Sequence, residues 1–144
     1  MRKFTAERLS KVVEAIDPRH FDMERWIDAW EQNGASIPIF GPAHVEKALE
    51  YLKPEHLKPC GTVACLAGWT CAVFPPRKRG GNEGAYIPEY AATRLGLTED
   101  ESDRLFHVNN WPPPYRGRYN KVKSGRGKLD VLKDRVAHFI VTGA

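Results

Sequence analysis

Apolar residues recur along most of the chain at intervals of three and four, which is the spacing of one face of an α-helix. Near the N-terminus, for example, Thr5 is placed to cap a helix whose inward face carries Leu9 and Val13. A chain with this pattern is expected to be mostly α-helical. The predicted helices cover about residues 6–16, 23–33, 42–52, 62–74, 88–95, 99–107 and 129–141.

The longest apolar stretch is residues 60–74, CGTVACLAGWTCAVF, which carries no charged side chain. We predict a helix over about 62–74, with Thr62 as its N-cap. A helix that is apolar all round belongs in the interior of a domain. The run is shorter than the roughly 20 residues that span a bilayer, so we interpret it as a buried central helix. A neighbouring helix could approach closely along its ridge of small residues, Ala64, Gly68 and Ala72.

Two other helix ends carry recognisable signals. Thr98 and Glu101 have the spacing of a capping box, in which each side chain bonds the backbone N–H of the other residue. Asp22 is suited to cap the second helix, which passes through Ile27 and ends at Gly34. These signals predict where helices begin and end, independently of the apolar pattern.

The chain has 144 residues, the usual size of one domain, and it shows no internal repeat and no long linker. We therefore predict a single compact domain over 1–144, with six or seven helices around the central helix. A basic loop that contains proline and glycine should interrupt them at about 111–128. No signal peptide pattern is visible and the three cysteines are an odd number, which favours reduced thiols in the cytoplasm.

Charge changes this picture, because it is distributed unevenly. The formal net charge is +4, yet residues 112–128 alone hold six basic and no acidic side chains. The rest of the chain holds the remaining 16 basic and all 18 acidic side chains, so its own balance is negative. A concentrated basic segment indicates an anionic partner more strongly than a diffuse excess of charge does.

The basic segment also contains aromatic residues, and the combination is typical of surfaces that bind nucleic acid. Lysine and arginine neutralise phosphates, and aromatic rings stack on bases. The glycines at 117, 125 and 127 would let backbone approach closely. A solvated loop that keeps the protein soluble is the plain alternative. The candidate anion-binding residues are Trp111, Tyr115, Arg116, Arg118, Tyr119, Lys121, Lys123, Arg126 and Lys128, with a second patch at Arg77, Lys78 and Arg79.

The cysteines raise two further hypotheses. Cys60, Cys65 and Cys71 lie near His56 in the sequence, but no CxxC pair is present and Cys65 and Cys71 diverge on a helix. Cys60 would lie near a helix N-terminus, where a thiolate is stabilised. No HExxH, GxSxG, Walker or GxGxxG motif is present. We therefore predict no catalytic residue, no metal site and no cofactor.

The order of several short motifs is similar to that of a known group. The motifs are, in chain order, Phe21-Asp22-Met23 with Trp26, CGTVACLAGW at residues 60–69, Leu95-Gly96-Leu97, Leu105-Phe106 and Trp111-Pro112. This resembles a group of small uncharacterised proteins of bacteriophages, prophages and bacteria with a CGTxxCxAGW core. The resemblance implies a compact helical protein of a mobile element, and it brings no activity with it.

The leading hypothesis is a non-enzymatic, phage-type binding protein that contacts an anionic partner through residues 111–128. Nucleic acid, a nucleoprotein complex and a nucleotide are the candidate partners, in that order. Interference with a host defence system would suit the resemblance, either by direct competition for nucleic acid or by sequestration of a nucleotide signal. A host protein is a further candidate partner. Two alternatives stay open: a cysteine-centred enzyme or zinc-binding protein, and a protein-interaction module that acts as a homo-oligomer. No membrane partner is expected.

Overall fold

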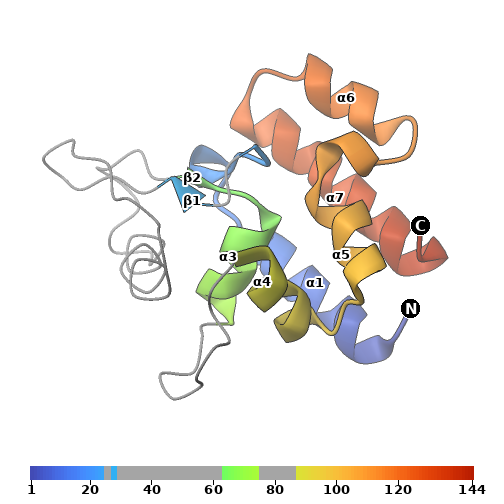
Figure 1. Ribbon diagram of the computed structural model, residues 1–144. Coiled ribbons are helices and arrows are strands. Elements are labelled where there is room, and N and C mark those ends of the chain that lie inside the picture. The colour runs from blue at the N-terminus through green and yellow to red at the C-terminus, as the bar shows by residue number, and fades with distance from the viewer. Residues whose placement is uncertain (25–26, 29–62, 75–86) are drawn as a thin grey trace, which may run out of the picture.

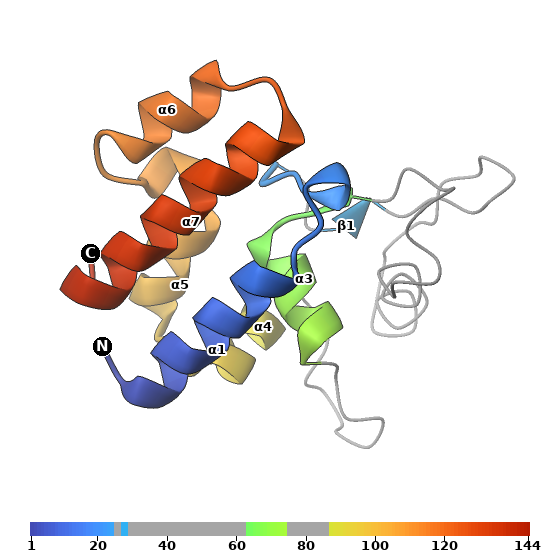
Figure 2. The same cartoon turned by 180° about the vertical axis from the view of Figure 1, so that it is seen from behind.

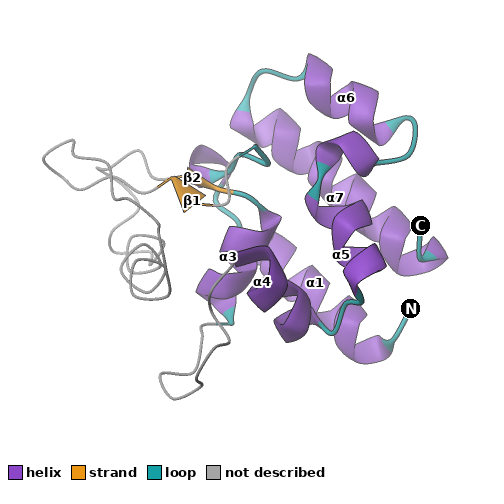
Figure 3. Ribbon diagram, in the orientation of Figure 1, coloured by secondary structure: helices purple, strands orange, loops and turns teal. Residues whose placement is uncertain are grey.

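The computed structural model describes residues 1–24, 27–28, 63–74 and 87–144, and in these ranges the protein is mostly α-helical (Figures 1 and 3). Two short 3₁₀ helices, η1 (Pro18–His20) and η2 (Val108–Asn110), join longer elements. The predicted fold class is therefore confirmed. The six α-helices of the described ranges are α1 (Lys3–Ala15), α3 (Leu66–Val73), α4 (Ile87–Leu95), α5 (Glu99–Phe106), α6 (Tyr115–Lys121) and α7 (Gly125–Thr142).

The longest of these helices, α7, lies alongside α1, and α6 packs against another side of α7 (Figures 1 and 2). Helix α3 packs on α1 and on α4, and α5 follows α4. One hydrophobic core fills the space between these helices. Helices α1, α3, α4, α5 and α7 contribute fully buried side chains, among them Leu9, Leu66, Leu95, Leu105, Leu132 and Phe139.

The central helix is shorter than predicted. Helix α3 begins at Leu66, with Cys65 at the N-cap, and its last residue is Val73. The preceding residues, Val63–Ala64, form strand β2 instead, which pairs antiparallel with β1 at Ile27–Asp28. A backbone that is committed to a partner strand cannot also form the first turn of a helix. The predicted burial is confirmed from Leu66 to Cys71, which are all buried, whereas Ala72, Val73 and Phe74 are half-buried.

The same pairing overturns the predicted second helix at Ile27–Asp28. Asp22 does not cap a helix there. Its Oδ1 accepts a bond from the Glu24 amide at 3.0 Å, and its own N–H donates to the Ala64 carbonyl at 3.1 Å. Pairing with a segment distant in sequence therefore overrides the local helical pattern. The predicted helix over 42–52, Cys60, His56 and the basic residues 77–79 lie outside the described residues.

The first helix begins earlier than predicted, at Lys3, and Arg2 occupies the N-cap without a side-chain bond. Thr5 is not the cap but a fully buried residue inside the helix. Its Oγ1 donates to the Gly96 carbonyl at 3.4 Å, which joins α1 to the end of α4. The predicted inward face of this helix, including Leu9 and Val13, is confirmed.

The capping box of α5 forms as predicted. The Glu101 amide donates to Thr98 Oγ1 at 3.2 Å, and the Thr98 amide donates to Glu101 Oε2 at 2.8 Å. The same carboxylate oxygen pairs with Arg2 at 2.6 Å, so the Arg2 hydrogen bond lowers the pKa of Glu101. Gly96 ends α4 with a φ of 70°, a conformation that glycine adopts without strain. Local signals thus place α4 and α5 correctly.

Candidate anion-binding surface

The basic segment is a helical hairpin, and the predicted loop at 111–128 is wrong for its larger part. Helix α6 occupies residues 115–121, and α7 begins at Gly125 rather than near 129. Ser124 caps α7, because its Oγ accepts the Gly127 amide at 3.1 Å. A capped helix start and a neighbouring helix hold the basic side chains on an ordered backbone.

Two of the three aromatic side chains of the segment belong to the core. Trp111 and Tyr119 are each 3% exposed, and their rings meet edge to face at 5.4 Å. Trp111 Nε1 donates to the Leu105 carbonyl at 2.9 Å, while the Tyr119 hydroxyl accepts from the Met23 amide at 2.9 Å. Burial raises the pKa of Tyr119. The predicted stacking of Trp111 and Tyr119 on bases is therefore incompatible with this structure.

Tyr115 is the third aromatic residue of the segment and is half-buried. Its ring lies 5.2 Å from the His138 ring of α7, tilted by 46°. Tyr115 and Tyr119 lie four residues apart on α6, whereas Trp111 lies before that helix. The spacing of the two tyrosines is the signal that the sequence analysis missed, because residues four apart share one face of a helix.

The cations of the hairpin fall into two groups. Arg118 pairs with Asp134 of α7 at 2.7 Å, and Lys128 Nζ lies 5.5 Å from the centre of the Tyr119 ring. The other four are exposed and make no ion pair within the ranges that the structure describes. We call these four residues the basic surface: Arg116, Lys121, Lys123 and Arg126. Three of them lie within six residues, around the turn between α6 and α7.

Two of the three glycines of the segment, Gly125 and Gly127, serve the protein's own packing. A Cβ at Gly125 would overlap the carbonyl oxygen of Pro18, and a Cβ at Gly127 would overlap Val122 Cγ1. Gly125 therefore lets the start of α7 approach η1 at the level of the backbone. At Gly117 a Cβ would meet nothing within 4 Å. Close packing inside the protein thus explains Gly125 and Gly127 without an approach to nucleic acid.

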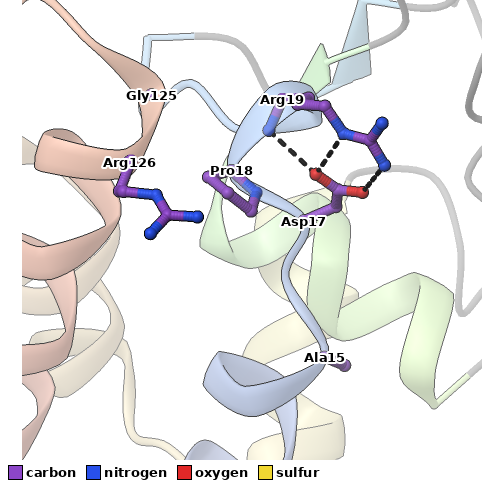
Figure 4. A pocket seen from close by; sticks show the side chains of 6 residues that line it. All are labelled: Ala15, Asp17, Pro18, Arg19, Gly125 and Arg126. Atoms are coloured by element: carbon purple, nitrogen blue, oxygen red, sulfur yellow. Dashed lines mark hydrogen bonds and ion pairs between the residues drawn. The ribbon is translucent and has the colours of Figure 1, made fainter.

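A cleft of about 610 Å³ lies where η1 faces the start of α7 (Figure 4). Its lining includes Arg126 of the basic surface and the pair formed by Asp17 and Arg19. The hydrogen bonds from Arg19 lower the pKa of Asp17 to about 2. Sequence reasoning missed Asp17 and Arg19 as site residues. No local signal connects them with Arg126, which follows more than a hundred residues later.

The described cysteines, Cys65 and Cys71, are buried at 0% and 1% exposure. Burial raises the pKa of Cys65 to about 12 and also raises that of Cys71, so both are thiols at neutral pH. Within the described residues, no three His, Cys, Asp or Glu side chains are grouped to hold a metal ion. Because Cys60 and His56 lie outside those residues, the cysteine-centred hypotheses stay predictions.

None of the described helices combines the length and the apolar character needed to cross a membrane. Comparison with protein-family models, with curated proteins and with solved structures gives no match. The likeness of residues 60–69 to a phage-associated group therefore stays a prediction.

Proposed function

We propose that this protein is a non-enzymatic binding protein that contacts the phosphate backbone of nucleic acid through the basic surface. The observation that carries the proposal is the set of four exposed cations on one hairpin with no ion-pair partner among the described residues. Such cations neutralise phosphates and release the counterions condensed on the nucleic acid, which is the main source of sequence-independent affinity.

The start of α7 adds support, because its charges run against the usual preference of helices. The N-terminal end of a helix favours acidic side chains, and α5 follows this preference with Glu99, Asp100 and Glu101 in its first turn. Helix α7 has no acid in its first turn and carries Arg126 there, with Lys123 just before. Departures from a local stability rule are expected where a surface serves binding.

The burial of Trp111 and Tyr119 favours double-stranded over single-stranded nucleic acid as the partner. Proteins that bind single strands without sequence preference use exposed aromatic rings as stacking platforms. The basic surface instead offers charges alone, which suit a duplex whose bases are already stacked on one another. Duplex DNA or RNA is therefore the proposed partner, ahead of a nucleoprotein complex or a nucleotide. Interference with a host defence system would follow if that duplex belongs to a defence complex.

The test is the salt dependence of binding to a labelled 20-base-pair duplex, measured by fluorescence anisotropy between 50 and 200 mM salt. Four phosphate contacts predict a slope of about −3.6 in log affinity against log salt, or roughly a 150-fold loss over this range. The double variant Lys121→Gln/Lys123→Gln should lose about 1.8 of that slope. A single strand of equal length should bind more weakly than the duplex.

The control is Lys3→Gln/Arg104→Gln, which removes two exposed cations outside the hairpin, one in α1 and one in α5. This variant has the same net charge as the Lys121 and Lys123 variant, so a general effect of charge would change both alike. Equal slopes for the two double variants, or no measurable duplex binding by the unaltered protein, would refute the proposed function.

A further inference from the structure

Helix α6 carries a glycine that the packing of the protein does not explain. Gly117 is exposed within the helix, and among the described residues a Cβ there would meet nothing within 4 Å. Glycine favours a helix less than any other residue except proline. Close contacts inside the protein account for Gly125 and Gly127, but nothing crowds position 117 in the part of the chain that the structure describes. A residue that weakens its own helix without a packing reason indicates a close approach from outside.

Gly117 faces away from the core. Successive residues of an α-helix are rotated by about 100°, so Gly117 lies about 160° around the helix axis from Tyr119. The Tyr119 side chain is buried, and its hydroxyl accepts the Met23 amide, which defines the inward side of α6. Figure 1 shows α6 on the outside of the helical arrangement, next to α7. The helix backbone at Gly117 is therefore accessible to a partner.

The face around Gly117 is cationic. By the same rotation, Lys121 lies about 40° to one side of Gly117 and Arg116 about 100° to the other. Both side chains are exposed and make no ion pair within the described ranges, and α6 contains no acidic residue. Asp134, the acid of α7 that contacts α6, is neutralised by Arg118 at 2.7 Å. This face therefore combines a bare backbone with a free cation on either side, which complements a strand of phosphates.

We propose that the duplex contacts α6 over Gly117, with its sugar–phosphate backbone against the bare helix between Arg116 and Lys121. Without a side chain at position 117, a phosphate oxygen can lie about 3.5 Å from the Gly117 Cα, the distance of a Cα–H···O contact. Lys121 is one helical turn from Gly117, so a strand in this position comes within reach of its ammonium group. The inference rests on the proposed function, and it adds which helix meets the duplex and where the approach is closest.

The decisive variant is Gly117→Leu, which fills the open space without changing the charge. Leucine is a good helix former, so the variant should be more stable than the unaltered protein. Because the side chain holds the duplex away from the helix, affinity should fall at least about tenfold, the effect of losing one charge-assisted hydrogen bond. Gly117→Ala should cause a smaller loss. Misfolding cannot explain weaker binding by a variant whose Tm has risen.

The control is Ser10→Leu, which adds the same side chain at an exposed position of α1, outside the hairpin. It should bind the labelled duplex as tightly as the unaltered protein does. If Gly117→Leu binds as tightly as Ser10→Leu, the proposal is overturned.

A double-mutant cycle tests the link between Gly117 and Lys121. In a Lys121→Gln background, Gly117→Leu should lower duplex affinity by a smaller factor than in the unaltered protein, because both changes remove the same contact. If the two effects on the free energy of binding are fully additive, the contact as proposed is overturned.

A second copy of this chain is the alternative occupant of the face, and sedimentation velocity distinguishes it from the duplex. We expect the unaltered protein and Gly117→Leu to sediment as the same species. A dimer of the unaltered protein that becomes a monomer in Gly117→Leu would assign the face to the second copy and overturn the proposal.

The contact at Gly117 and the proposed function can fail separately. If Lys121→Gln/Lys123→Gln weakens duplex binding while Gly117→Leu does not, the contact at Gly117 is overturned and the function stands. If the unaltered protein binds no duplex, the function is refuted and the contact with it.

Discussion

The glycines of the basic segment allow a sharp test of the packing between η1 and α7. Alanine at position 125 should destabilise the protein, whereas alanine at position 117 should stabilise it. Both substitutions add one methyl group to a helix at a residue without a positive φ. They differ in surroundings, because a Cβ at Gly125 overlaps the Pro18 carbonyl oxygen and a Cβ at Gly117 meets nothing within 4 Å.

The magnitudes follow from these surroundings. Replacing an unhindered helical glycine with alanine is worth about 0.5–1 kcal/mol, since the unfolded chain loses conformational freedom. At Gly125 the obstacle is a backbone atom that cannot rotate aside, so η1 and α7 must move apart. Overpacking of this kind costs about 1–3 kcal/mol. For a domain of this size, about 3 °C of Tm corresponds to each kcal/mol. Gly117→Ala should therefore raise Tm by about 2–3 °C, and Gly125→Ala should lower it by about 3–9 °C.

The assay is thermal and urea unfolding followed by circular dichroism at 222 nm, with coincident probes to establish two-state behaviour. The double variant should equal the sum of the single effects, because the two sites share no contact. A Gly125→Ala protein as stable as the unaltered one would refute the close approach of α7 to η1. It would also remove the structural basis of the cleft.

Two further predictions concern titratable groups. In a Cys60→Ser background, Cys65 and Cys71 should react with a thiol reagent at pH 8 at least a hundredfold more slowly in buffer than in urea. The reason is that burial keeps both thiols protonated and inaccessible. Rapid labelling of the folded protein would contradict their burial. Asp17→Asn should lower Tm at pH 7 by about 1–3 °C, as expected for an exposed ion pair. The pKa of Asp17 is lowered from 3.8 to about 2. The stabilisation by the ion pair is therefore complete above pH 3.8 and is lost as the pH falls through about 2. A difference in Tm between the two proteins that persists unchanged to pH 2 would be inconsistent with this ion pair.

Local sequence signals were sufficient for elements that depend on near neighbours. The capping box at Thr98 and Glu101 and the glycine end of α4 at Gly96 formed as predicted, because their partners lie within a few residues. The inward face of α1 also followed from the periodicity of its apolar residues. The start of that helix did not, since Thr5 bonds the distant Gly96 carbonyl rather than a neighbouring amide.

Elements that depend on distant partners were wrong for the same reason. Residues 63–64 fit the apolar helical pattern, yet pairing with residues 27–28 makes them a strand. The candidate site shows the effect more clearly. A segment of aromatic residues interleaved with cations has the same sequence pattern whether the rings face solvent or the core. The spacing of Tyr115 and Tyr119 indicates a shared face only where the backbone is helical, and Trp111 lies before that helix.

The sequence by itself therefore determined the helical class of this protein, the concentration of positive charge in residues 112–128 and the apolar character of residues 60–74. The tertiary structure decided which members of the basic segment are available to a partner. It buried Trp111 and Tyr119, exposed Arg126, and brought Arg126 to the same cleft as Arg19. Apolar periodicity reflects neighbours a few residues apart, whereas the burial of a side chain and the proximity of distant charges depend on how elements such as η1 and α7 pack together.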